Sequence, residues 1–283
     1  MKPQLIRQLL LLVAFAVTPA LRAATTYEWT FDAGNIATSV GNGAMTAADA
    51  ATPGLTSFAT TNGSSVPHIN GVAAQYMSVP AFSTSTNGYL LTFDDSGPNG
   101  GGAYLNQYSI LMDVYSPGAA GWQALFNTRT DNANDADWYI DSAGKLGIGA
   151  LGYSAAGAVG QNQWYRLAFV ADLGAGVVKY FVNGTLAYTR TGSSLLDGRF
   201  AVYSNADAGA DLLLFNEGDS SGVYTHPLYV NSVAFTDTNL SDSAIAALGG
   251  ASAGGIFPVP EPSRAGLLVL AAIGLVFARR RRA

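Results

Sequence analysis

The feature that most limits the possible folds is a series of short segments in which apolar residues alternate with polar or small ones. In Tyr108–Tyr115, for example, the residues Tyr108, Ile110, Met112 and Val114 fall on one face of an extended chain. Turn-forming residues separate such segments about every 8–12 residues, as is typical of antiparallel sandwiches. Further strands are predicted over Trp164–Val170, Phe200–Ser204, Asp211–Phe215 and Leu228–Thr236. We therefore predict an all-β, antiparallel β-sandwich of the jelly-roll type.

One hairpin and one short helix can be placed within this pattern. Asn183-Gly184 joins the strands predicted over Val177–Val182 and Thr185–Thr189, and Asn-Gly is the preferred pair for a type I′ turn. Ser241 is suited to cap a short helix that ends at Gly249. The composition agrees with strands and tight turns, since the 283 residues include 33 glycines and only 12% charged residues.

Charge and cysteine content exclude several classes of function. Between the two terminal segments described below lie six basic and 18 acidic residues, which give that body a net charge of about −12. An acidic body repels phosphates, so we expect no binding to nucleic acid. The chain has no cysteine, which excludes thiol nucleophiles and thiolate metal sites. Calcium and neutral glycans remain compatible with this charge.

Residues 1–23 have the pattern of a secretory signal peptide. Lys2 and Arg7 form a basic start, Leu9–Val17 is apolar, and Ala23 offers a small residue for cleavage. We therefore expect the protein to be exported.

The C-terminal segment, residues 259–283, combines a short motif with an apolar stretch and a basic end. The motif is Val259, Pro260, Glu261, Pro262 and Ser263; residues 265–278 are apolar and residues 279–282 are all arginine. Fourteen apolar residues span about 21 Å as a helix, less than the ~30 Å hydrocarbon core of a membrane. Residues 251–258, between body and tail, are predicted to be a flexible linker because they are rich in glycine, alanine and serine.

This tail resembles the PEP-CTERM sorting signal. The resemblance implies recognition by an exosortase, a membrane peptidase that cleaves near the motif, in a Gram-negative bacterium that makes exopolysaccharide. It also implies transient association with the inner membrane through residues 265–278, followed by transfer to the cell surface or extracellular matrix. A simple tail anchor with a proline-rich stalk is the alternative.

The body, residues 24–250, resembles laminin G-like and concanavalin A-like sandwiches. Three segments carry the resemblance: Tyr27–Asp32, Gln163–Phe169 with the following Val182–Gly184, and Asn231–Phe235 with Leu240–Gly249. Members of these families bind glycans or proteins, often with calcium at the rim, and a related branch hydrolyses glucans.

One acidic segment is the nearest counterpart of a hydrolase site. An extended chain would place Asp135, Asp137, Tyr139 and Asp141 on one face, with neighbouring side chains roughly 7 Å apart. That spacing suits paired carboxylates, but the glutamates of the glucanase motif are missing. We therefore predict a non-catalytic protein, with these four residues as candidate glycan contacts and a solvated sheet face as the alternative.

Two further sets of residues are candidates for ligand binding. Asn216, Glu217 and Asp219 lie in an acidic turn that could hold calcium, or could simply be a hairpin loop. Trp122, Trp138, Trp164 and Tyr224 could stack on sugars, although large aromatic residues more often belong to a core. His68 and His226 each adjoin a proline and are predicted to lie in surface turns.

The leading hypothesis from sequence is thus a non-catalytic surface or matrix protein that binds exopolysaccharide or a neighbouring surface protein. A purely structural matrix component is the first alternative, and a glycan hydrolase the second.

Overall fold

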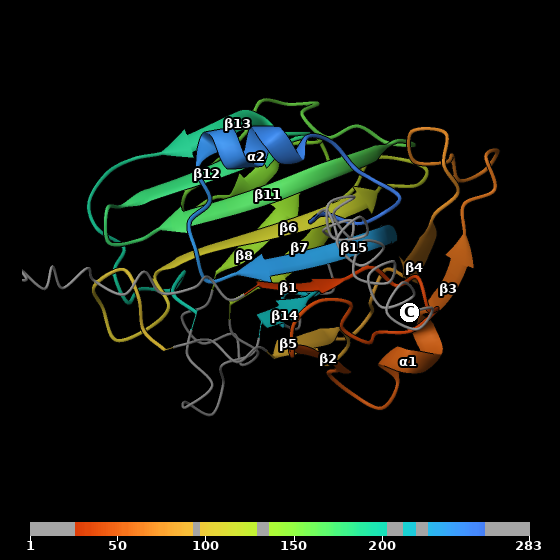
Figure 1. The fold of residues 1–283 in the computed structure, drawn as a ribbon, viewed down its shortest axis with the longest axis horizontal. Coiled ribbons are helices and arrows are strands. Elements are labelled where there is room, and N and C mark those ends of the chain that lie inside the picture. The colour runs from red at the N-terminus through yellow and green to blue at the C-terminus, as the bar shows by residue number, and fades with distance from the viewer. Residues whose placement is uncertain (1–25, 93–96, 129–135, 203–211, 219–225, 258–283) are drawn as a thin grey trace, which may run out of the picture.

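The computed structural model describes residues 26–92, 97–128, 136–202, 212–218 and 226–257, which form two packed antiparallel sheets (Figure 1). Sheet A has the order β13-β12-β11-β6-β15-β4-β3, and β1 also pairs with β15. Its strands are β13 (Thr185–Arg190), β12 (Val177–Val182), β11 (Trp164–Asp172), β6 (Gln107–Tyr115), β15 (Leu228–Thr236), β4 (Gln75–Val79), β3 (Ser57–Thr60) and β1 (Thr26–Trp29).

Sheet B has the order β10-β9-β8-β7-β14-β5-β2. Its strands are β10 (Gly152–Tyr153), β9 (Leu146–Ile148), β8 (Asp137–Ile140), β7 (Gln123–Asn127), β14 (Leu212–Leu214), β5 (Tyr89–Thr92) and β2 (Ala44–Ala47). Two short helices complete the described elements, α1 (Thr52–Leu55) and α2 (Asp242–Leu248). Neither described helix is long and apolar enough to cross a membrane. The predicted all-β antiparallel sandwich is therefore confirmed.

Aromatic side chains from both sheets fill the space between them. Phe169 of sheet A lies with its ring centre 5.5 Å from that of Trp138 and 5.1 Å from that of Phe126, both in sheet B. Tyr108 stacks on Phe169 from the neighbouring strand at 5.8 Å. Such ring contacts contribute beyond the apolar area they bury, and the alternation along β6 and β11 places these rings on the inner face.

Part of the outer face of sheet A is covered by a helix and by the segment that follows it. Helix α2 is capped by Ser241, whose hydroxyl accepts a hydrogen bond from the N–H of Ala244, and the helix buries Ile245. The chain then continues over the same face as Gly249–Phe257, which we call the strap. Ile256 of the strap and Ile245 of the helix pack with Leu111 of β6 in a second apolar cluster.

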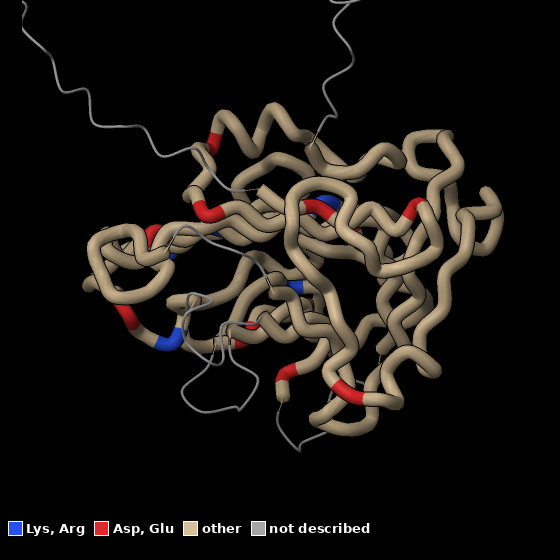
Figure 2. Tube along the Cα trace, turned by 60° about the horizontal axis from the view of Figure 1, so that its bottom comes forward, with Lys and Arg blue, Asp and Glu red and all other residues tan. Residues whose placement is uncertain are grey.

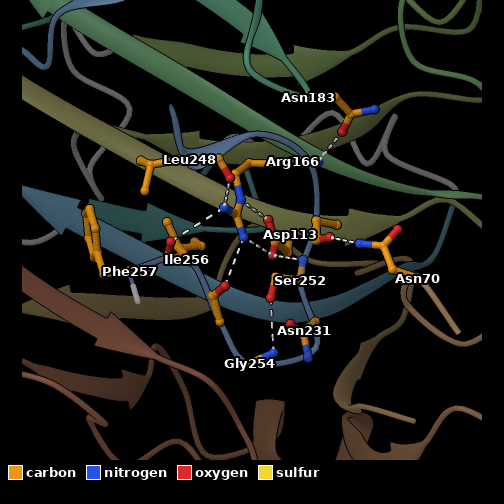
Figure 3. Close-up of polar contacts among 12 residues, drawn as sticks. Asn70, Asp113, Arg166, Asn183, Asn231, Leu248, Ser252, Gly254, Ile256 and Phe257 are labelled. Atoms are coloured by element: carbon orange, nitrogen blue, oxygen red, sulfur yellow. Dashed lines mark hydrogen bonds and ion pairs between the residues drawn. The ribbon is translucent and has the colours of Figure 1, made fainter. Parts of the chain in front are cut away.

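A buried ion pair fixes the strap to sheet A (Figure 3). Arg166 of β11 lies directly opposite Asp113 of β6, and its guanidinium donates two hydrogen bonds of 2.7 Å to the carboxylate. The same guanidinium donates to the carbonyls of Leu248 and Gly255, while Asp113 accepts from the N–H of Ser252. The strap thus supplies backbone partners for two buried charges, which would otherwise be costly to desolvate.

The strap corrects one expectation from sequence. Residues 251–258 were expected to form a flexible linker, yet Ala251 and Ile256 are buried and the described part of this segment is bonded to the sheet. Composition favoured a linker because glycine, alanine and serine are common in flexible chains. Here the small side chains instead let the backbone approach Arg166, Asp113 and Glu28 closely.

Candidate functional site

A hollow lies at the end of sheet A where β11 begins and β12 ends. It has a volume of about 420 Å³, within the usual range for small-ligand sites. Three segments surround it: the loop between β3 and β4, the start of β11, and the junction of the β12–β13 turn with the strap. Its lining residues are Pro67, His68, Ile69, Asn70, Asn162, Gln163, Trp164, Asn183, Gly250 and Ala251.

Trp164 is the aromatic residue of this hollow. It is half-buried as the first residue of β11, and its indole N–H donates to the carbonyl of Pro67 at 2.8 Å. Tyr115 and Tyr76 pack against it, with ring centres 5.4 and 6.3 Å away. The hydrogen bond and the two ring contacts fix the indole without covering it completely, so that an apolar ring surface remains at the hollow.

Asn183 and Asn70 each use one end of their amide to hold the wall in place (Figure 3). The Oδ1 of Asn183 accepts from the backbone N–H of Arg166 at 2.9 Å. The Nδ2 of Asn70 donates to the carbonyl of Ala251 at 2.9 Å, which joins the β3–β4 loop to the strap. Both residues have positive φ, of 50° each, a conformation that asparagine adopts more readily than most residues.

Asn162 and Gln163 complete the rim on the side of β11. Asn162 accepts from the N–H of Gly118 at 3.0 Å and donates to the carbonyl of the same residue, so both ends of its amide are occupied. Gln163 donates to the hydroxyl of Tyr165. All four amide side chains that line the hollow belong to residues that are exposed to solvent.

Among the described residues of the lining there is no aspartate, glutamate, lysine or arginine. Glycoside hydrolysis by the usual route requires two carboxyl groups about 5–9.5 Å apart. The described lining combines an aromatic ring with neutral polar groups and contains no such pair of carboxyl groups.

Of the tryptophans predicted as stacking platforms, only Trp164 lines the hollow. Trp138 is fully buried between the sheets, and half-buried Trp122 packs edge-on against Tyr139 with ring centres 5.8 Å apart. Tyr224 lies outside the described residues. The alternation rule placed Trp138 on the inner face, but it could not distinguish Trp122 from Trp164.

The candidate glycan contacts on β8 do not form an open polar face. Tyr139 is buried and its hydroxyl donates to Glu217 at 3.2 Å. Asp141 follows the strand and accepts from the N–H groups of Ala143 and Lys145, each at 2.8 Å, which makes it part of a turn. Asp137 is half-buried at the first position of β8, and Asp135 lies outside the described residues.

The candidate calcium turn is only partly described, and one of its residues does not fit the role of ligand. The amide oxygen of Asn216 already accepts from the N–H groups of Glu217 and Gly218, and its Nδ2 donates to two backbone carbonyls. Asp219 lies outside the described residues. No group of three acidic or histidine side chains that could hold a metal ion occurs within the described part of the chain. Calcium at this turn therefore stays a prediction, to be tested by comparing thermal melts with calcium and with EDTA.

Sequence reasoning missed Asn70 and the strap, and it assigned His68 and Asn183 to turns without a further role. The sorting motif, Val259, Pro260, Glu261, Pro262 and Ser263, lies outside the described residues. Asn70-Gly71 and Asn183-Gly184 are both Asn-Gly pairs, but the sequence has four others, so this signal marks turns and does not single out the two asparagines. What brings them together is the topology, since these pairs are more than 100 residues apart.

No protein-family model and no curated protein matches this chain. Solved structures resemble it in fold. Domain 4 of the extracellular arabinanase AbnA from Geobacillus stearothermophilus, solved with arabinotriose, is 17% identical; the match covers 80% of this chain and 98% of that one, with a TM-score of 0.46. The binding domain of botulinum neurotoxin serotype G is 11% identical, over 78% of this chain and 50% of that one, with a TM-score of 0.49. The CBM40 of the Ruminococcus gnavus IT-sialidase, bound to α2,3-sialyllactose, is 19% identical. The match covers 52% of this chain and 84% of that one, with a TM-score of 0.39. At these identities the likeness concerns the fold alone.

Proposed function

We propose that this protein is a non-catalytic saccharide-binding protein whose site is the hollow around Trp164. The observation that carries the proposal is the half-buried ring of Trp164, which lines the hollow together with neutral amide side chains. A sugar ring has one apolar face and a polar edge of hydroxyl groups. An aromatic ring can cover that face while amides bond the edge.

The site is built to remain in one shape when empty. Trp164, Asn70 and Asn183 each have a hydrogen bond to backbone that fixes their orientation. Little side-chain entropy is then lost on binding, so more of the contact energy is expressed as affinity.

Replacement of Trp164 by alanine tests the proposal. We expect the Trp164→Ala variant to bind soluble polysaccharides or oligosaccharides at least tenfold more weakly, about 1.4 kcal/mol, because the stacking surface is lost. Binding would be screened on a glycan array and quantified by calorimetry for the ligands found.

The matched control is Trp122→Ala, which removes a half-buried tryptophan outside the hollow. Thermal melts of both variants would show that they remain folded. Equal affinity of wild type and Trp164→Ala would refute the site. Absence of saccharide binding by the wild type would favour a purely structural matrix component.

We further propose that the protein is exported and that an exosortase-type peptidase releases it at residues 259–263. Proline at positions 260 and 262 favours an extended, accessible backbone there. In the producing cell, replacement of Pro260, Glu261 and Pro262 by alanine should leave the uncleaved chain in the membrane fraction. Wild-type protein should appear at the surface or in the matrix as a shorter chain. Unchanged length in both strains would count against sorting by this motif.

A further inference from the structure

We infer that the hollow selects a neutral saccharide, through a hydrogen-bond donor from Asn183 and an acceptor from Asn70 in a lining without formal charge. This inference rests on the proposed function and names the class of ligand. The inference follows from the hydrogen bonds that Asn183 and Asn70 already make, because these bonds show which amide atom of each residue is left for a ligand.

The amide nitrogen of Asn183 is the donor. A backbone N–H can only donate, so the atom that accepts from Arg166 must be the oxygen of Asn183. This leaves the Nδ2 group, which has no hydrogen bond to any described residue, pointing away from the buried ion pair (Figure 3). Because Asn183 is exposed and lines the hollow, this NH₂ group is available to a ligand oxygen.

The amide oxygen of Asn70 is the acceptor. The carbonyl of Ala251 can only accept, so the atom bonded to it must be the nitrogen of Asn70. The oxygen at the other end of this amide has no hydrogen bond to a described residue and points away from the bond that the nitrogen makes (Figure 3). Two of the segments that surround the hollow thus present a donor and an acceptor, and hydroxyl groups of a sugar can satisfy both.

The charges around the site disfavour an acidic sugar. None of the described lining residues is a lysine or arginine. Arg166, whose backbone N–H bonds Asn183, is 3% exposed, and its guanidinium is engaged by Asp113 and the strap. Acidic residues also outnumber basic ones along the described trace (Figure 2). A uronate bound here would lose water around its carboxylate without gaining a cation, which costs free energy.

The decisive variant is Asn183→Asp. Aspartate has the same shape, tolerates positive φ, and can still accept from the N–H of Arg166. It replaces the NH₂ donor by an oxygen that repels a hydroxyl oxygen. In the full chain we expect at least tenfold weaker binding of neutral glucose- or galactose-based oligosaccharides, with an unchanged melting temperature.

Asn35→Asp is the matched control. Asn35 is exposed and its Oδ1 accepts from the N–H of Ala37, as Oδ1 of Asn183 accepts from Arg166, but it does not line the hollow. It introduces the same charge while leaving the site intact. We expect it to bind as the wild type does.

The second arm compares neutral oligosaccharides with glucuronate and galacturonate oligosaccharides of equal length. We expect the wild type to bind the neutral ligands at least tenfold more tightly, at both low and high salt. Salt screens long-range repulsion of uronates by the acidic body. A preference for neutral ligands that persists at high salt would therefore come from the hollow itself.

The outcomes distinguish this inference from the proposed function. Equal binding by Asn183→Asp and wild type, or a preference for uronates, would overturn the inference and leave saccharide binding at Trp164 in place. Failure of the wild type to bind any saccharide would overturn both.

Discussion

At the scale of single residues, the most informative group is Glu28. This residue of β1 is 1% exposed, and its carboxylate accepts from the N–H groups of Ile256 and Phe257 in the strap. Burial raises the pKa of Glu28 above its ordinary value of 4.5, although the two strap N–H groups oppose the shift. The folded protein therefore keeps this proton at pH values where the unfolded chain has released it.

The sign of the pH dependence follows from linkage. A raised folded-state pKa of an acid means that its contribution to stability falls as pH rises from about 4.5. Glutamine does not titrate, so we expect the melting temperature of Glu28→Gln, relative to wild type, to increase between pH 4 and pH 7. Thermal melts at closely spaced pH values would measure this difference.

Asp49 provides a control of opposite sign. Hydrogen bonds from the hydroxyl and N–H of Thr52 lower the pKa of Asp49, so its contribution to stability is lost as pH falls. The melting temperature of Asp49→Asn relative to wild type should therefore decrease as pH rises. Parallel curves for wild type and Glu28→Gln would contradict the assignment for Glu28.

At the scale of elements, the strap acts as part of the sandwich. Removal of Ala251–Phe257 would leave Arg166 without the carbonyl of Gly255 and Asp113 without the N–H of Ser252. It would also uncover apolar residues of β6 and β11. Buried charges that lose partners are strongly destabilising.

A chain that ends at Gly250 should consequently be less stable than one that ends at Phe257, by about 3–5 kcal/mol. Urea denaturation of the two chains would measure this difference. The longer chain is the matched reference because it keeps every bond of the strap. Equal urea midpoints for the two chains would mean that the strap contributes nothing to the stability of the sandwich.

Elements with a strong local signal could be predicted from sequence. β15 occurs at Leu228–Thr236 as predicted, and β6 and β11 differ from prediction by one or two residues at an end. The Asn183-Gly184 turn has the two positive φ values expected, 50° and 78°. Period-two patterns and turn chemistry are local, so a single sequence suffices to recognise them.

Elements whose role depends on distant partners could not be predicted. Nothing near Arg166 in the sequence indicates that Gly255 lies on its guanidinium, and a segment rich in glycine, alanine and serine favours a linker on local grounds. The hollow likewise combines residues from the regions around positions 70, 164, 183 and 251. Trp164 could be named as a candidate, but its choice over Trp122 required the topology.

At the scale of the whole molecule, α2 and the strap cover part of the outer face of sheet A, and the hollow around Trp164 lies at one end of that sheet. The hollow remains where the strap enters that face beside the β12–β13 turn. The proposed ligand site is therefore completed by the last part of the chain to be synthesised within the body. A saccharide site at this place can form only after the strap has docked.

The contact between Glu28 and the strap has a consequence for connectivity. The first strand of the body and its last described residues lie against one another, so the two ends of the described sandwich are neighbours in space. The leader that we expect before β1 and the sorting tail that we expect after the strap would therefore be attached at neighbouring points of the body.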